Sequence, residues 1–207
     1  LIVPIGDWVI EEVCRQLRKW HDKGMSIYSA INLSARQLWR EETVTHITDT
    51  IEEHGIAPDS VEIEITESTT MMDPSNVAQI LEEMREAGLH VSIDDFGTGY
   101  SSLERLKHMP VRTLKIDRSF VGGIPESERD TNIVTTVIQL ASNFRMFSLA
   151  EGIETVEQWE FLRELECPLG QGYYFSRPVP PEQIEEMYEN ETVWSIDAES
   201  EPENVVS

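Results

Sequence analysis

Short apolar runs alternate along the chain with longer segments in which apolar residues recur at helical spacing. The apolar runs predict six strands, each bounded by polar or glycine-containing turns. The helical periodicity predicts a helix before the first strand and after most of the others. The predicted strands cover residues 26–34, 60–66, 89–94, 113–117, 146–150 and 172–176.

Capping residues locate the ends of several predicted helices. The first helix is expected over residues 6–22, with Gly24 just beyond its end. A short helix is expected after Pro181, because proline suits the first turn. The expected N-terminal caps are Asp73 followed by Pro74, Asp130, and Thr155 with Gln158 at capping-box spacing.

Alternating strands and helices predict an α/β fold with a parallel sheet. The sequence contains neither a glycine-rich dinucleotide fingerprint nor a Walker-type phosphate loop. We therefore expect a (β/α)8 TIM-type barrel, a fold of about 250 residues. Six strands in 207 residues predict an N-terminally truncated barrel with about six βα units, and the Leu1 start indicates a piece of a longer protein. Residues 1–190 would form this partial barrel, and residues 191–207 an acidic, flexible tail.

The chain is strongly acidic, with 39 Asp and Glu against 16 Lys and Arg and a formal net charge of −23. This charge opposes binding to DNA or RNA duplexes and to anionic membranes. No apolar run approaches the length of a membrane-spanning helix. Cys14 and Cys167 lack metal-type spacing, so we expect free thiols and a reducing, cytoplasmic location.

Polar side chains gather at the carboxyl ends of the predicted strands, where (β/α)8 barrels carry their chemistry. Almost all offer oxygen ligands, which favours a hard divalent cation such as Mg²⁺, Mn²⁺ or Ca²⁺. One is a lysine, which needs carboxylate partners if it is buried. The five histidines lie elsewhere, and we interpret them as surface or packing residues. The strand-end residues are Asn32, Glu64, Glu67, Asp94, Asp95, Lys115, Asp117, Glu151, Glu154 and Gln171.

Each of these residues also has an ordinary structural interpretation. Asp94 and Asp95 could belong to a solvated turn, with a serine after them capping the next helix. Asn32 could cap the helix that follows it, and Glu151 could lie favourably near a helix N-terminus. Their coincidence at successive strand ends favours a common site. Several carboxylates also suit two ions that share an aspartate, an arrangement used in phosphoester hydrolysis.

Six motifs follow one another along the chain, namely INLSARQL, EIEITES, SIDDFGTGYSSL, LKIDRSFV, AEGIET and QGYYFSRP. In order and spacing they resemble the motifs of the EAL-domain phosphodiesterases, which hydrolyse cyclic di-GMP. The resemblance runs from residue 1 to about residue 180, and the fold that it implies is again a (β/α)8 barrel. It implies a metal-dependent, cyclic-guanylate-specific phosphodiesterase that opens cyclic di-GMP to linear pGpG in bacterial second-messenger signalling.

The resemblance implies a role for each matching residue. Lys115 and Glu151 would be catalytic, beside two Mg²⁺ or Mn²⁺ ions in the complete domain. Glu154, Gln171 and Asp117 would support the site or bind the substrate. Glu67 would anchor the loop after the paired aspartates, through which the family forms homodimers. The implied metal ligands are Asn32, Glu64, Asp94, Asp95 and Glu151, and the loop comprises Phe96, Gly97, Thr98, Gly99, Tyr100, Ser101 and Ser102.

The chain departs from the family pattern at its start, where the Glu-Ala-Leu segment is absent. One metal ligand and an arginine expected to contact the substrate are absent with it. We therefore expect weak metal binding and little turnover by this piece alone. The alternative is a catalytically inactive module that binds cyclic di-GMP or couples to partners, and a barrel hydrolase for another phosphodiester is a remoter one. The parent protein is expected to carry an attached sensory or GGDEF domain.

Overall fold

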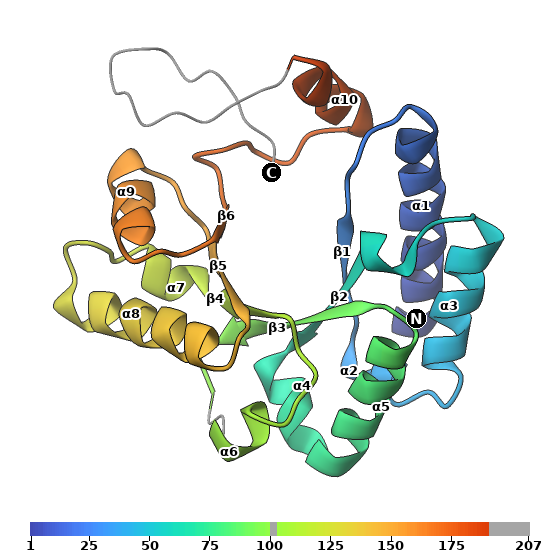
Figure 1. Ribbon diagram of the computed structural model, residues 1–207, viewed down its shortest axis with the longest axis horizontal. Helices are drawn as coiled ribbons and strands as arrows, with labels where there is room; N and C mark the ends of the chain where they lie inside the picture. The colour runs from blue at the N-terminus through green and yellow to red at the C-terminus, as the bar shows by residue number, and fades with distance from the viewer. Residues whose placement is uncertain (100–102, 191–207) are drawn as a thin grey trace. The chain divides into compact units, whose positions relative to one another are not determined.

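The computed structural model describes residues 1–99 and 103–190, and in these ranges six strands alternate with helices (Figure 1). The strands follow one another in the sheet in chain order. The pairs β1–β2, β2–β3 and β5–β6 are parallel. The strands are β1 (Ser29–Asn32), β2 (Val61–Thr66), β3 (His90–Phe96), β4 (Thr113–Ile116), β5 (Phe147–Glu151) and β6 (Leu169–Gln171).

One helix precedes β1 in the described residues, and at least one helix follows every strand. The expected α/β fold with six βα units is therefore confirmed. The helices are α1 (Ile2–Asp22), α2 (Ala35–Leu38), α3 (Thr43–Glu53), η1 (Pro58–Ser60, a 3₁₀ turn), α4 (Glu67–Met72), α5 (Pro74–Glu86), α6 (Leu103–Leu106), α7 (Arg118–Val121), α8 (Glu128–Asn143), α9 (Val156–Glu164) and α10 (Pro181–Glu189).

The sixth strand lies earlier than the aromatic run predicted. β6 ends at Gln171, and the residues expected to form it make a turn instead. Phe175 N–H and Ser176 N–H both donate to the Gly172 carbonyl, at 3.1 and 3.2 Å. The Phe175 ring packs edge-on against Trp159, with 5.0 Å between ring centroids. Packing against α9 therefore decides the conformation of a segment whose alternation resembles that of a strand.

Two helix starts also differ from the prediction. The first helix begins at Ile2 rather than residue 6. Asp130 is not a cap, because α8 begins at Glu128 and the Asp130 N–H itself donates to Ser127 Oγ at 3.3 Å. The other two caps are confirmed, since Asp73 accepts from Asn76 N–H and Thr155 forms a capping box with Gln158.

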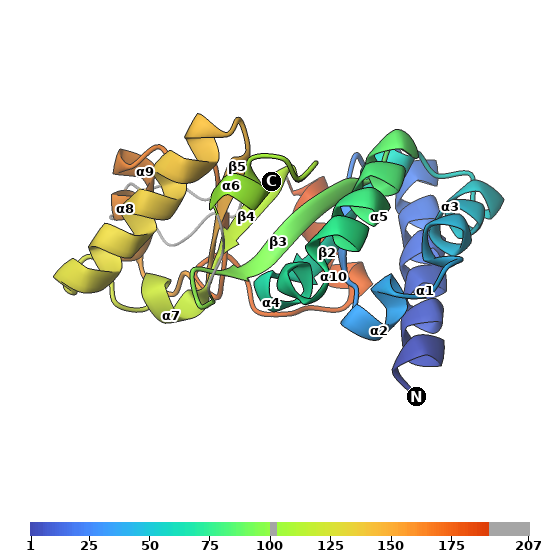
Figure 2. The same ribbon diagram turned by 90° about the horizontal axis from the view of Figure 1, so that it is seen from below.

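The chain divides into two compact units. The first comprises residues 1–114 and 144–146, and the second comprises residues 115–143 with the described residues from 147 onward. In the first unit α1 lies beside α3 in both views (Figures 1 and 2). Helix α1 buries one stripe at helical spacing, formed by Ile10, Cys14, Leu17 and Trp20. In the second unit α8 packs on α7 and β5.

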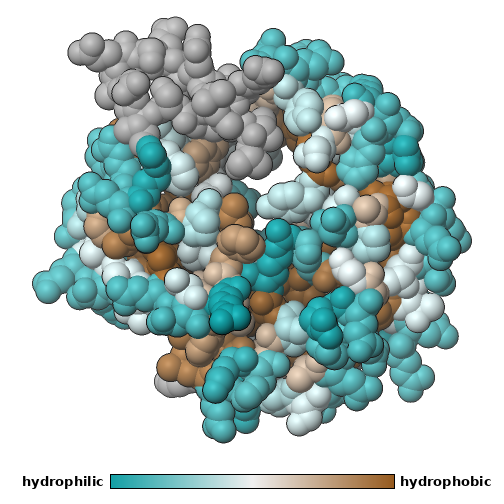
Figure 3. Space-filling view, viewed as in Figure 1, coloured by the Kyte–Doolittle hydropathy of each residue, from teal (hydrophilic) through white to brown (hydrophobic). Residues whose placement is uncertain are grey.

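Hydrophilic side chains cover most of the outer helix surfaces in the face shown in Figure 3, as the net charge leads one to expect. Hydrophobic side chains are visible mainly between the helices. None of the helices in the described part of the chain has both the length and the apolarity needed to cross a membrane.

Candidate active site

In the first unit, β1 and β2 place Asn32 and Glu64 side by side. The parallel register pairs these two residues, and Leu33 N–H donates to the Glu64 carbonyl at 2.8 Å. Glu64 alternates with Ile63 and Ile65 along β2, and it is buried, with 8% of its surface exposed. An exposed amide and a buried carboxylate are therefore paired in register on these two strands.

The paired aspartates stand at the end of β3, where Asp94 is in register with Thr66 of β2. Asp95 has a positive φ of 55°, a conformation that few residues other than glycine adopt. Its N–H donates to Asp94 Oδ1 at 3.0 Å, and its carbonyl accepts from Thr98 Oγ1 at 2.8 Å. The two carboxylates therefore lie on a sharp, hydrogen-bonded reversal, which is the kind of strained backbone that gathers at functional sites.

Glu67 holds the segment that follows the aspartates. It is the first residue of α4, and only 2% of its surface is exposed. Its Oε2 accepts hydrogen bonds from Gly97 N–H at 2.9 Å and Gly99 N–H at 3.2 Å. Gly97 has a φ of 98°, which favours glycine there. Phe96 still belongs to β3, whereas Tyr100–Ser102 lie outside the described residues, and so do the serines considered above as caps.

In the second unit, Lys115 and Glu151 form an ion pair. Lys115 Nζ lies 2.7 Å from Glu151 Oε1, and the two side chains are 4% and 20% exposed. The residues occupy the third position of β4 and the last position of β5. A buried ammonium is costly without an anionic partner, so this pair explains how a lysine is tolerated in a fully buried strand.

The segment after Glu151 is held closely in place. Gly152 has a φ of 72°, and Ile153 N–H donates to the Gln171 carbonyl at 3.1 Å. Glu154 N–H donates to Gln158 Oε1 at 2.8 Å, while the Glu154 side chain is exposed. Gln171 is likewise exposed, at the end of β6.

Asp117 has a structural role in its own unit. Its carboxylate caps α7, accepting from the backbone N–H of Ser119 at 3.0 Å. The Ser119 hydroxyl donates to the same oxygen.

The structure divides the ten expected strand-end residues equally between the two units. The first unit contains Asn32, Glu64, Glu67, Asp94 and Asp95, and the second contains Lys115, Asp117, Glu151, Glu154 and Gln171.

The donor chemistry of these residues fits a hard divalent cation. In the described ranges, no three His, Cys, Asp or Glu side chains already stand together as a metal-binding group. Asn32 and Glu64 are nevertheless in register and both carry side-chain oxygens, and oxygen ligands are those that Mg²⁺ and Mn²⁺ prefer. Ser92, in register with Glu64, is fully buried, and its Oγ has no hydrogen-bond partner among the described residues. Such an orphaned polar atom calls for a water or ion-bound partner nearby.

Sequence reasoning missed three residues that support these positions. Ser92 gave no signal, because a serine within an apolar strand is common. Arg118 gave no signal either. It packs so closely against Gly152, the residue after Glu151, that a Cβ at Gly152 would lie 2.5 Å from the Arg118 Cβ. Gln37 could have been found, since it follows Ser34 at capping-box spacing directly after Asn32.

Comparisons with known proteins identify close relatives. Residues 1–178 match the family model described as EAL domain. The chain is 42% identical to the cyclic di-GMP phosphodiesterase NbdA of Pseudomonas aeruginosa over 187 residues, which are 90% of this chain and 24% of NbdA. The solved structure of the PaMucR phosphodiesterase in complex with c-di-GMP is 42% identical, with a TM-score of 0.86, covering 89% of this chain and 75% of that one.

A solved complex of Klebsiella pneumoniae BlrP1 with calcium and cy-diGMP is 30% identical to this chain. Its TM-score is 0.76, and the match covers 84% of this chain and 44% of that one. The chain spans about a quarter of the curated relatives that it matches. These likenesses confirm the α/β barrel class expected from the strand count.

Proposed function

Because this chain belongs to the EAL-domain cyclic di-GMP phosphodiesterase family, we propose that it is a metal-dependent phosphodiesterase domain that opens cyclic di-GMP to linear pGpG. The observation that carries the proposal is the buried Lys115 ammonium beside Glu151 at the ends of β4 and β5. The Glu151 carboxylate makes a cation that is only 4% exposed tolerable, and a phosphodiester substrate would give that cation a function.

Lys115 would act directly on the reacting phosphate. Glu151 Oε1 holds its Nζ at 2.7 Å, and an ammonium group is a strong donor to a phosphodiester oxygen. Negative charge that develops on this oxygen is stabilised best where water is excluded, as it is around Lys115. In the reaction, a water oxygen bonds to phosphorus, the bond from phosphorus to the 3′ oxygen breaks, and a proton passes to the leaving 3′ oxygen. The product then keeps a 5′-phosphate.

Five residues would hold the divalent cations, two per site in the complete domain. When bound, Mg²⁺ or Mn²⁺ would neutralise the adjacent aspartates and lower the pKa of a water molecule. Asn32 and Glu64 would bind through side-chain oxygens of two residues that are in register, and the reversal at Asp95 fixes the backbone of the paired aspartates. The proposed metal ligands are Asn32, Glu64, Asp94, Asp95 and Glu151.

The remaining residues of the site would support the substrate and its regulation. Glu154 and Gln171 are exposed and able to contact substrate, and Asp117 holds the start of α7. The Glu67-anchored segment 96–99, with residues 100–102, would form the regulatory loop and the homodimer contact. MucR of Pseudomonas aeruginosa, a relative, is named a bifunctional diguanylate cyclase and phosphodiesterase, which supports an attached GGDEF or sensory domain. We place the activity in the cytoplasm, in keeping with two buried free thiols.

The 207-residue chain alone is expected to turn over slowly. The Glu-Ala-Leu segment of the family, with the metal ligand that it carries, is not among these 207 residues, and the match covers three quarters of the solved PaMucR chain. Adding the upstream sequence of the parent protein should therefore strengthen metal binding and raise the hydrolysis rate.

The test is cyclic di-GMP hydrolysis with Mg²⁺ or Mn²⁺, followed by chromatography of pGpG. It compares this chain and the upstream-extended chain with Lys115→Met versions of both. We expect product mainly from the extended chain, and a loss of about a hundredfold or more on Lys115→Met. Lys19→Met makes the same change at an exposed position and should leave the rate intact. If both chains bind cyclic di-GMP and neither cleaves it, the domain is a binding module and the enzyme proposal is wrong.

A further inference from the structure

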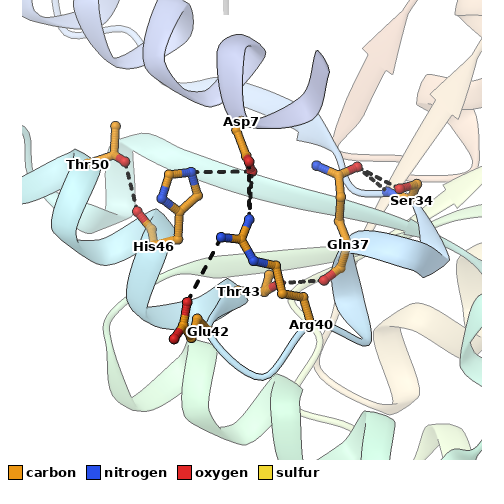
Figure 4. A network of polar contacts seen from close by, with 8 residues as sticks. All are labelled: Asp7, Ser34, Gln37, Arg40, Glu42, Thr43, His46 and Thr50. Atoms are coloured by element: carbon orange, nitrogen blue, oxygen red, sulfur yellow. Dashed lines mark hydrogen bonds and ion pairs between the residues drawn. The ribbon is translucent and has the colours of Figure 1, made fainter. Parts of the chain in front are cut away.

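Gln37 is a buried amide placed directly behind the turn that carries Asn32. It lies on α2, and only 5% of its surface is exposed. Its Oε1 accepts two hydrogen bonds from Ser34, one from Oγ at 2.6 Å and one from the backbone N–H at 3.2 Å (Figure 4). Both bonds fix a residue that lies two positions after Asn32.

Helix α1 closes the other side of this amide. A Cβ at Gly6 would lie 1.7 Å from Gln37 Nε2, so the Gln37 side chain fits only because residue 6 is glycine. Gly6 is itself buried within α1, where glycine normally weakens a helix. The close approach of Gln37 therefore explains why a glycine is present within this helix despite its effect on helix stability.

Further polar contacts hold α1 against this part of the first unit. Arg40 Nη1 donates to Asp7 Oδ2 at 3.1 Å, and His46 Nε2 lies 3.4 Å from Asp7 Oδ1 (Figure 4). The Thr43 hydroxyl donates to the Gln37 carbonyl. The side chain and the carbonyl of Gln37 are therefore both fixed, and α1 is tied to the helices that follow β1.

The turn after β1 is thus held at both ends. On one side the sheet holds it, because Asn32 is in register with Glu64 and Leu33 N–H donates to the Glu64 carbonyl at 2.8 Å. On the other side Gln37 holds Ser34. We propose that Gln37 is a positioning residue, which fixes the Asn32–Ser34 turn and thereby aims the Asn32 side chain at the divalent cation. This inference rests on the proposed function and assigns a role to a residue that the ligand set does not include.

The test compares three variants of the chain. Gln37→Leu keeps a similar volume and removes the acceptor for Ser34. Gln37→Glu keeps acceptor oxygens in the same place and should rescue the positioning. Ile47→Val removes one methyl group from a fully buried residue of the same unit and leaves the Ser34 contacts alone, so it controls for loss of packing.

Two measurements are made on each variant. Hydrogen exchange of the Leu33 and Ser34 amides in metal-free protein reports the turn itself. Titration with Mn²⁺, followed by electron paramagnetic resonance, reports the metal affinity. For Gln37→Leu we expect about tenfold faster exchange of the Ser34 amide and about tenfold weaker Mn²⁺ binding, the size typical when a group that orients a ligand is lost. Gln37→Glu should stay near the wild type in both, and Ile47→Val should change neither.

The outcomes separate this inference from the proposed function. If the wild-type chain binds Mn²⁺ and Gln37→Leu leaves both measurements at the level of Ile47→Val, only the role of Gln37 is wrong. If Gln37→Leu frees the turn while Mn²⁺ affinity is unchanged, Gln37 supports the fold and does not position a ligand. If neither the wild-type nor the upstream-extended chain binds Mn²⁺, the proposed metal-dependent function is wrong, and so is the proposed role of Gln37.

Discussion

His90 shows how a single contact can set a protonation state. Arg112 Nη1 donates to the imidazole ring of His90, the first residue of β3. A guanidinium only donates, so the ring nitrogen that it reaches must accept and be unprotonated. Burial lowers the pKa of His90 below its ordinary value of 6.5, and the Arg112 charge lowers it further, against smaller opposing effects of Glu62 and Asp59.

This shift predicts a pH-dependent stability. Because the folded-state pKa of His90 is depressed, the unfolded chain takes up the proton first as pH falls. The stabilisation is therefore fully present above the unfolded pKa of about 6.5 and is lost as pH falls below it. We expect the free energy of unfolding to drop more between pH 8 and pH 5 in the wild type than in His90→Gln. Gln still accepts from Arg112 and does not titrate. Parallel pH curves in urea titrations would contradict the assignment.

The role of a residue could be predicted where it belongs to a sequence motif. It could not be predicted where the role depends on a contact with a residue far away in the chain. The strand-end carboxylates and Lys115 stood out because acids and a lysine are unusual in apolar runs. Gln37 depends on Gly6, and Arg118 depends on Gly152, and both partners are more than thirty residues away in the chain. No local pattern records such an approach.

At the scale of elements, one glycine sets the direction of the chain after β5. Gly152 follows Glu151 directly with a φ of 72°, and Arg118 leaves no room for a side chain there. Gly24, after α1, has a similar φ of 80°, and a Cβ added to it would meet no atom within 4 Å. Comparing substitutions at Gly24 and Gly152 therefore separates the free-energy cost of a left-handed backbone from the free-energy cost of steric overlap.

We predict that Gly152→Ala destabilises the chain more than Gly24→Ala. Gly24→Ala adds only the left-handed penalty of about 1–2 kcal/mol. Gly152→Ala adds overlap with Arg118, about 1–3 kcal/mol more. Urea unfolding of both variants gives the difference, and equal losses would mean that Arg118 moves aside freely. Gly152→Ala should also lower cyclic di-GMP hydrolysis in the extended chain, because Glu151 lies next to the altered backbone.

Helices and strands were predicted well where buried apolar residues recur at regular spacing along the chain, and poorly where the element is too short for such a repeat. Helices α1, α3, α5 and α8 carry long apolar stripes, and the predictions found all four. The one-turn helix α7 is too short to show a period, so it was missed, whereas α2 and α6 were expected only as helices that Asn32 or a serine could cap. The aromatic run after Gln171 was taken for a strand because its true partner, Trp159, lies on a separate helix.

At the scale of the whole molecule, the dominant feature is a net charge of −23. Self-repulsion of that size destabilises compact states, and salt screens it with a Debye length of about 10 Å at 0.1 M. Added NaCl should therefore raise the melting temperature. A divalent cation would do so as well by screening, so stabilisation by Mn²⁺ is informative only above an NaCl control of equal ionic strength.

The specific part of that stabilisation follows from linkage. A ligand at a hundred times its Kd stabilises the folded chain by about 2.7 kcal/mol. For a protein of this size each kcal/mol shifts the melting temperature by about 2–4 °C. We therefore expect saturating Mn²⁺ to raise the melting temperature of the extended chain by about 5–10 °C beyond the matched NaCl control. Glu64→Gln and Asp94→Asn should each abolish most of this excess.

The control variant separates a site from a charged surface. Glu82→Gln removes one acidic charge from the exposed face of α5, where the carboxylate already pairs with Arg85. Diffuse attraction of Mn²⁺ to an acidic surface depends on total charge. If that attraction caused the stabilisation, all three substitutions would reduce the rise in melting temperature beyond the NaCl control by the same small amount. Binding at the proposed site depends on two particular oxygen ligands, so only Glu64→Gln and Asp94→Asn would remove it. Equal, small effects of all three substitutions would place the Mn²⁺ on the surface and leave the metal-dependent mechanism without its cation.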